Sequence, residues 1–298
     1  MSGCRVVKGL PNPEYHKQQP VSEHYFSSSQ VKDAYKNIGH FAEKHIKRTI
    51  ISNMDKPSLR KGTYFHAMIL EPDTLPGQPN EEILHYTESK TRSGKKWKEF
   101  QEANPGKTIL TDSEIEEAKE MASVALRDPN ILNLLQGSEY EISYFLDDLM
   151  GFQVKARADI ISSAGFVADL KSCAGDPQDI DYIKGEVSKW GYDVSAAFYM
   201  DIINKCLELN GDDYRIEKWF WAFASGVKQT SKVYQATDEV LRIGRYKYQQ
   251  GMKGMAKAQA ANWEIPNEIE YIDPVYWDRE FLDKIEQQST SPKGSNFL

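Results

Sequence analysis

The alternation of hydrophobic and polar residues is clearest between Phe152 and Cys173, where it predicts two antiparallel strands. We expect strands over 152–161 and 166–173, because β-branched and aromatic residues flank a short Ser-Ser-Ala-Gly turn. Side chains of a strand alternate between its two faces, so Asp169 and Lys171 project from the same face. The pattern therefore predicts a carboxylate and an ammonium held side by side on a rigid support.

A second acid, Asp159, precedes the turn, and a hairpin would bring it opposite this pair. Two acids and a lysine suit a magnesium site that cuts phosphodiesters, because hard cations take oxygen ligands and keep positions open for water and phosphate. The alternative is a solvated strand face, since so short a pattern occurs in many unrelated chains. The apolar neighbours Val167 and Leu170 favour a central strand, in which an unpaired charge is costly to bury.

Apolar residues at helical spacing predict most of the remaining elements. The first helix is expected to cover the core, and Pro72 ends the second one two residues after Leu70. We expect helices over 30–42, 61–70, 111–128, 130–136, 192–209 and 239–261, a loop and short helix over 176–190, and further strands over 217–225 and 231–238.

Length and composition bound the organisation of the chain. Its 298 residues, 40% hydrophobic and 27% charged, suffice for one large core or two small ones. Proline and polar residues predict an extended arm over 1–24, one domain over 25–286 and a disordered tail over 287–298. We expect a cytoplasmic protein, because no apolar run reaches membrane-spanning length and the first residues lack the apolar segment of a secretory signal.

The three cysteines, Cys4, Cys173 and Cys206, are far apart in sequence and odd in number. This argues against a disulfide framework and against a four-thiolate zinc or iron–sulfur site. We expect them to be small buried side chains.

The net charge of −7 does not indicate a nucleic-acid binder, so any positive field must be local. Lys95 and Lys96 stand in a cluster of five basic residues around Trp97. Such a cluster could bind a phosphate backbone. A solvated helix start with a core tryptophan is an equally good interpretation.

Two further helices carry candidate site residues. His66 lies in a mostly apolar helix, where a lone histidine is more often a hydrogen-bonded core residue than a ligand. Tyr192, Ser195 and Tyr199 form a polar stripe on the helix that follows the Asp169 strand. Tyr199 is a candidate substrate contact or a core tyrosine with a bonded hydroxyl.

Six segments in fixed order resemble one family, the RecE-type exonucleases (the nuclease domain of exonuclease VIII). This family is a branch of the PD-(D/E)xK nuclease superfamily common in phages and prophages. The resemblance covers about Tyr25 to Trp263. It is carried by GTYFHAMILEPD at 62–73, SGKKWKEFQEANPGKTIL at 93–110, KARAD at 155–159, ADLKS at 168–172, GYDVSAAFY at 191–199 and IGR at 243–245.

The resemblance implies an α/β fold with a central mixed β-sheet flanked by helices. It also implies an exonuclease that uses Mg²⁺, with Mn²⁺ as the alternative ion, to degrade the 5′-ended strand of duplex DNA, and that leaves 3′ overhangs for recombination. Related enzymes form rings around DNA, so we expect a homo-oligomer, with a single-strand annealing protein as a further partner and no membrane.

The resemblance also implies roles for individual residues. Asp159, Asp169, His66 and the Leu170 carbonyl would bind the metal, and Lys171 would position the attacking water and stabilise charge on the phosphate. Glu141, just ahead of the hairpin, could be an extra acid near the metal. Substrate contacts are assigned to Tyr199, Ser195, Tyr192, Arg157, Lys95 and Lys96.

One departure from the family pattern concerns end recognition. The helix after the lysine usually carries Gln-x-x-x-Tyr, and here Ser195 stands at the glutamine position while Tyr199 is kept. A shorter hydroxyl cannot reach as far toward the DNA end as an amide. This leaves two alternatives open, an endonuclease or flap nuclease with the same site, and a DNA-binding module whose site has decayed.

Overall fold

The computed structural model describes residues 3–17, 19–51, 55–89, 91–265 and 279. Residues up to Trp263 form one compact unit built on a six-stranded sheet in the order β1-β4-β5-β6-β7-β8. The β6–β7 pair is parallel and the other neighbours are antiparallel, so the sheet is mixed, as predicted. The strands are β1 (Cys4–Val7), β4 (Glu139–Leu149), β5 (Phe152–Ser162), β6 (Phe166–Ser172), β7 (Lys218–Ser225) and β8 (Thr230–Gln235).

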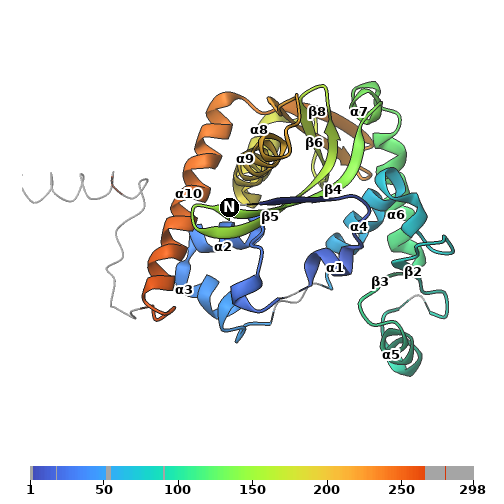
Figure 1. Ribbon diagram of the computed structural model, residues 1–298. Coiled ribbons are helices and arrows are strands. Elements are labelled where there is room, and N and C mark those ends of the chain that lie inside the picture. The colour runs from blue at the N-terminus through green and yellow to red at the C-terminus, as the bar shows by residue number, and fades with distance from the viewer. Residues whose placement is uncertain (1–2, 18, 52–54, 90, 266–278, 280–298) are drawn as a thin grey trace, which may run out of the picture. The chain divides into compact units, whose positions relative to one another are not determined.

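Helices cover both faces of the sheet (Figure 1). One face packs against α2 (Ser28–Lys36), α9 (Tyr192–Asn210) and α10 (Asp238–Ala260) in the larger hydrophobic core. The other face packs against α4 (Pro57–Leu70), α6 (Asp112–Ala125) and α7 (Pro129–Leu135). The expected hairpin forms β5 and β6, and the expected capping pattern begins α6 with Thr111 as its N-cap. Two further helices, α3 (Ile38–Phe41) and α8 (Ile180–Trp190), contribute Phe41 and Ile183 to the larger core.

Two glycines on α10 allow it to lie against the backbone of its neighbours. A Cβ at Gly244 would lie 2.0 Å from the carbonyl oxygen of Asp193 in α9, and one at Gly251 would lie 2.7 Å from that of Val31 in α2. Next to this crossing, Arg245 donates two hydrogen bonds to Asp201, at 2.8 and 2.7 Å. The Ile243–Arg245 segment therefore packs α10 against α9 and fixes the position of the first turn of α9.

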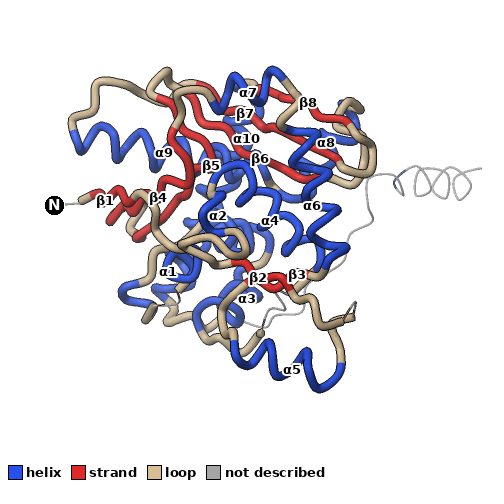
Figure 2. The backbone as a smooth tube through the Cα atoms, turned by 90° about the vertical axis from the view of Figure 1, so that its right-hand side faces the viewer, coloured by secondary structure: helices blue, strands red, loops and turns tan. Residues whose placement is uncertain are grey.

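The segment from Ile83 to Leu110 forms a small unit beside α4 and α6 (Figure 2). Strands β2 (Ile83–His85) and β3 (Thr108–Leu110) pair in parallel, and α5 (Gly94–Ala103) connects them. Trp97 packs against Tyr86 in a separate small core, and the guanidinium of Arg92 lies 4.2 Å from its ring. The interpretation of Trp97 as a core anchor is thus confirmed.

The N-terminal residues differ from the extended arm expected over 1–24. Strand β1 pairs with β4 at the edge of the sheet, and α1 (Asn12–His16) and a 3-10 turn at Val21–Glu23 follow it. The prediction missed them because the pairing partners are about 140 residues away in sequence. The expected domain end at 286 and the tail over 287–298 lie outside the described residues.

The expectation of three unpaired cysteines is wrong for two of them. Cys4 and Cys206 form a disulfide, and Cys173 is a free thiol. Pairing of β1 with β4 brings Cys4 over α9, across 202 residues of sequence, so spacing along the chain gave no signal. Within the described part of the chain, no helix is both long enough and apolar enough to cross a bilayer.

Candidate metal and phosphodiester site

Three acids lie in one row across neighbouring strands. The register of β4 and β5 puts Glu141 opposite Asp159, and the register of β5 and β6 puts Asp159 opposite Asp169. The regular β5–β6 pairing ends one residue before this row, at Ile160 and Ala168. Asp159 Oδ2 there accepts a hydrogen bond from the backbone N–H of Leu170 at 2.9 Å. The strands therefore separate at the row, and carboxylates occupy the fork.

Glu141 has a backbone conformation that is unusual for a strand residue. Its φ is +50°, in the left-handed region that L-residues other than glycine seldom adopt. Such strain costs of order 1–3 kcal/mol and is found mostly where the surrounding structure needs it, as at functional sites. The strain at Glu141 accompanies a carboxylate held beside Asp159 and His66.

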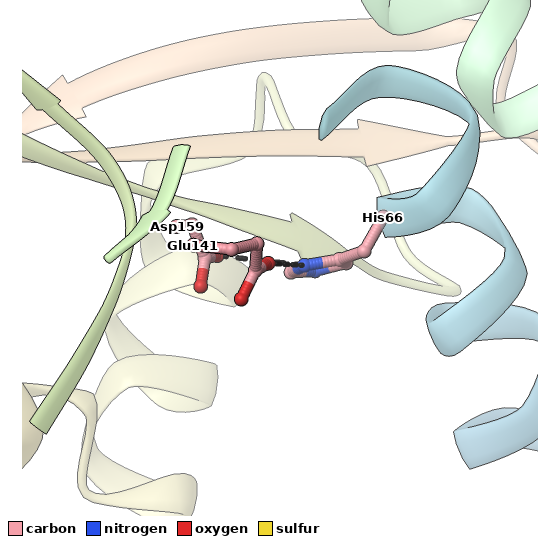
Figure 3. Close-up of side chains that lie close together, drawn as sticks. All are labelled: His66, Glu141 and Asp159. Carbon is pink, nitrogen blue, oxygen red and sulfur yellow. Dashed lines mark ion pairs between the residues drawn. The ribbon is translucent and has the colours of Figure 1, made fainter. Parts of the chain in front are cut away.

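His66 points from α4 toward the two acids (Figure 3). Its Nδ1 lies 3.6 Å from Asp159 Oδ2 and 4.0 Å from Glu141 Oε1. Its Nε2 lies 3.0 Å from the carbonyl oxygen of Leu170, which can only accept a hydrogen bond. Nε2 therefore carries a hydrogen, and Nδ1 is the nitrogen presented to the acids. Burial lowers the pKa of His66, but the charges of Asp159 and Glu141 outweigh burial and raise the pKa above its ordinary value.

The donor set of these three residues fits a divalent cation. Ligand atoms of His66, Glu141 and Asp159 all lie within 4.8 Å of one another. Two carboxylate oxygens and an imidazole nitrogen suit Mg²⁺ or Mn²⁺, and the hydrogen bond at Nε2 orients the ring, as the outer partners of metal-bound histidines do. All three residues line a cleft of about 760 Å³, which leaves room for water and substrate.

The buried Asp169 and the half-buried Lys171 form an ion pair beside this group, with Lys171 Nζ 2.7 Å from the Asp169 carboxylate. Burial, together with the charge of Asp159, raises the pKa of Asp169 to about 6, although Lys171 opposes this. Burial lowers the pKa of Lys171, but Asp169 and Asp159 outweigh burial and raise it, so the ammonium stays charged. The structure therefore brings the predicted Asp159, Asp169, Lys171 and His66 together, with Asp169 bonded to the lysine.

The predicted polar stripe on α9 lies on the same side. The ring centre of Tyr192 is 5.2 Å from Lys171 Nζ, and Tyr199 lines the cleft. Ser195 does not face open solvent, because its hydroxyl accepts a hydrogen bond from Lys32 at 3.0 Å and donates one to Ser28 at 3.2 Å.

Three predicted substrate contacts have other surroundings. Arg157 lines the cleft but is buried, and it donates hydrogen bonds to the Ser143 hydroxyl at 2.9 Å and the Leu10 carbonyl at 2.8 Å. Lys95 and Lys96 lie on α5 with 89% and 74% of their side chains exposed, and neither lines the cleft.

Sequence reasoning gave little weight to several cleft residues. Glu141 had only its position ahead of the hairpin as a signal, and Lys107, in the turn before β3, had none. Glu71 also lines the cleft, and burial and the charge of Glu141 raise its pKa to about 7. Tyr15 and His16 reach the cleft because the N-terminal segment folds across the sheet edge.

The chain is similar in sequence to one protein family and in fold to a solved structure. Residues 27–273 match the family described as "PDDEXK-like domain of unknown function (DUF3799)". The fold is similar to the crystal structure of a candidate exonuclease from Eubacterium rectale, with a TM-score of 0.58 and 18% identity, covering 92% of this chain and 98% of that chain. No curated protein sequence matches the chain. The predicted superfamily is thus confirmed, while the RecE branch stays a prediction. Because the match extends over residues 27–273, well over half of its length, the chain belongs to the PDDEXK-like family.

Proposed function

We propose that this protein is a divalent-metal-dependent deoxyribonuclease that degrades duplex DNA from its ends. The observation that carries the proposal is the row of Glu141, Asp159 and Asp169 across three strands, with His66 and Lys171 beside it. A purely structural sheet has no reason to keep three carboxylates in a row, because like charges directly opposite one another destabilise strand pairing.

Each side chain has a distinct part in the proposed reaction. His66, Glu141 and Asp159 would hold the cation, and Asp169 completes the acidic row. The chemistry that bound Mg²⁺ or Mn²⁺ supplies is activation of water near neutral pH and neutralisation of charge on the phosphate. Lys171 stabilises the charge that develops on the phosphate, and its bond to Asp169 holds the ammonium in place. Removal of one such group typically costs roughly a hundredfold or more in rate.

The finer points of the proposal are 5′-to-3′ polarity on duplex DNA, 3′ overhangs as product, a ring-shaped homo-oligomer, a single-strand annealing partner and a cytoplasmic location. Their support is the resemblance of the motifs to RecE-type exonucleases and the similarity of fold to a protein named as a candidate exonuclease. Exposed Lys95 and Lys96 on α5 would contact the DNA backbone outside the cleft.

The test is cleavage of a linear duplex labelled at either end, beside a covalently closed circle of the same sequence. We expect Mg²⁺-dependent loss of nucleotides from the 5′ ends, an intact circle, and no reaction with EDTA. Cutting of the circle would instead show an endonuclease. Absence of any metal-dependent cleavage of either substrate would contradict the proposal and favour a DNA-binding module.

A pair of lysine variants separates chemistry from binding. Lys171→Met should bind duplex DNA as the wild type does but cleave at least about a hundredfold more slowly. Lys184→Met is the matched control, because Lys184 is exposed on α8 and pairs with Asp181 at 3.2 Å. Equal loss of activity in both variants would mean that general charge, and not the position of Lys171, matters.

A further inference from the structure

Lys32 is a half-buried ammonium on which the carboxylates of Asp169 and Asp193 act without contacting it. From α2, its Nζ donates a hydrogen bond to the Ser195 hydroxyl at 3.0 Å and to the carbonyl oxygen of Trp190 at 3.1 Å, and both acceptors are neutral. Within the described part of the chain, no carboxylate forms an ion pair with it. A charge removed from water is costly unless an anion compensates it. The position of Lys32 thus implies either that the protein tolerates the free-energy cost of burying this charge or that an anion binds to it.

The ammonium lies close to the proposed catalytic pair. Burial and, next, the charge of Lys171 lower the pKa of Lys32 to about 8, although Asp169 and Asp193 oppose this. Ser195, which receives its hydrogen bond, is one helical turn before Tyr199 on α9, and Tyr199 lines the cleft. Lys32 therefore lies near the Asp169–Lys171 pair, on the side of α9.

The stem of Lys32 is fixed by packing. Gly191 joins α8 to α9 with φ +62°, and a Cβ there would lie 2.8 Å from Lys32 Cδ. The glycine thus leaves the space through which the side chain reaches across the helix junction. An exposed lysine would sample many rotamers, whereas this one holds its ammonium at a defined point.

We propose that Lys32 binds a phosphate of the DNA strand that is cut, with the hydroxyls of Ser195 and Ser28 beside it. A phosphate supplies the missing counter-charge, and Nζ keeps a third hydrogen after its two bonds within the protein. The long side chain of Lys32 would thereby contact a phosphate that lies beyond the reach of the short Ser195 side chain. This inference deepens the proposed function and rests on it.

The test measures binding separately from cutting. Fluorescence anisotropy gives the dissociation constant of the full chain for a labelled linear duplex, with Ca²⁺ in place of Mg²⁺, over a series of salt concentrations. The variants are Lys32→Met, Lys32→Arg, Ser195→Gln and the double variant Lys32→Met with Ser195→Gln. Lys36→Met is the matched control, because Lys36 lies exposed on the next turn of α2. Thermal melting of each variant reports on folding.

We expect Lys32→Met to weaken binding about tenfold or more and to lower the slope of log affinity against log salt by about one, as loss of one phosphate contact does. Lys32→Arg should keep the slope, because it keeps the charge. In the double variant the neutral amide should recover part of the affinity but not the slope. Lys36→Met should stay within about twofold of the wild type.

Two results lead to different conclusions. If the wild type binds duplex DNA and Lys32→Met keeps both its affinity and its salt slope, Lys32 only joins helices and the inference is wrong. If the wild type binds no duplex DNA at all, the proposed function itself fails, and the role of Lys32 fails with it. If Lys32→Met melts well below the wild type, Lys32→Gln takes its place, because its amide is neutral but can still donate hydrogen bonds to Ser195 and Trp190. A salt slope lower by about one in Lys32→Gln supports the inference, and an unchanged slope contradicts it.

Discussion

Replacement of Gly244 by alanine tests how α10 places the first turn of α9. The added Cβ would lie 2.0 Å from the Asp193 carbonyl oxygen and 2.5 Å from its carbon, both backbone atoms. Real Cβ atoms essentially never come closer than 3.0 Å, so the two helices must separate locally by about 1 Å. Overpacking of this kind costs typically about 1–3 kcal/mol, and a backbone obstacle places this case at the upper end.

The expected net loss for Gly244→Ala is therefore about 2 kcal/mol, after the gain of about 1 kcal/mol from replacing a helical glycine. Urea unfolding measures this loss directly, and a melting temperature lower by roughly 4–8 °C should accompany it. Gly254→Ala is the control on the same helix, because its Cβ meets Ile38 Cδ1 at an ordinary 3.8 Å. It should be neutral or stabilising by up to about 1 kcal/mol. Equal stability of the two variants would refute the close crossing.

Three further predictions concern other parts of the molecule. Glu141→Gln should weaken Mn²⁺ binding by at least about tenfold in a calorimetric titration. Even residues that only hydrogen-bond a metal ligand typically contribute about tenfold to a hundredfold in affinity. Unchanged affinity would show that Glu141 is not a ligand. Burial lowers the pKa of Lys155 from 10.5 to about 8, so the unfolded chain binds more protons between these values and stability rises with pH there. The unfolding free energy of wild type minus that of Lys155→Met should rise by about 3 kcal/mol from pH 8 to 10.5, and a flat difference would contradict this. Cys4→Ser should lower the free energy of unfolding by about 2–5 kcal/mol under oxidising conditions and leave it unchanged when both proteins are reduced. Three titratable thiols in the unfolded, unreduced wild type would exclude the disulfide to Cys206.

The sequence predicted the part of the site that local pattern determines. The β5–β6 hairpin follows from alternation around one short turn, and it carries Asp159, Asp169 and Lys171 together. Helical spacing predicted α4, and the family resemblance singled out His66 on it. Short-range geometry of this kind is readable because strand and helix periods fix which side chains share a face.

The rest of the site depends on contacts between distant segments. Glu141 joins the row through the register of β4 against β5 and through a positive φ, and neither has a sequence signature. Lys32 meets Ser195 across 163 residues, where α2 packs on α9. Cys4 reaches Cys206 because β1 pairs with the far strand β4. Periodicity describes one element at a time, so it does not say which elements will meet.

The most direct test of the proposed cation site is anomalous diffraction from a crystal soaked in Mn²⁺. We expect a strong anomalous peak between His66 Nδ1 and the carboxylates of Glu141 and Asp159. A crystal that holds Mn²⁺ elsewhere on the protein but shows no peak among these three side chains would contradict it.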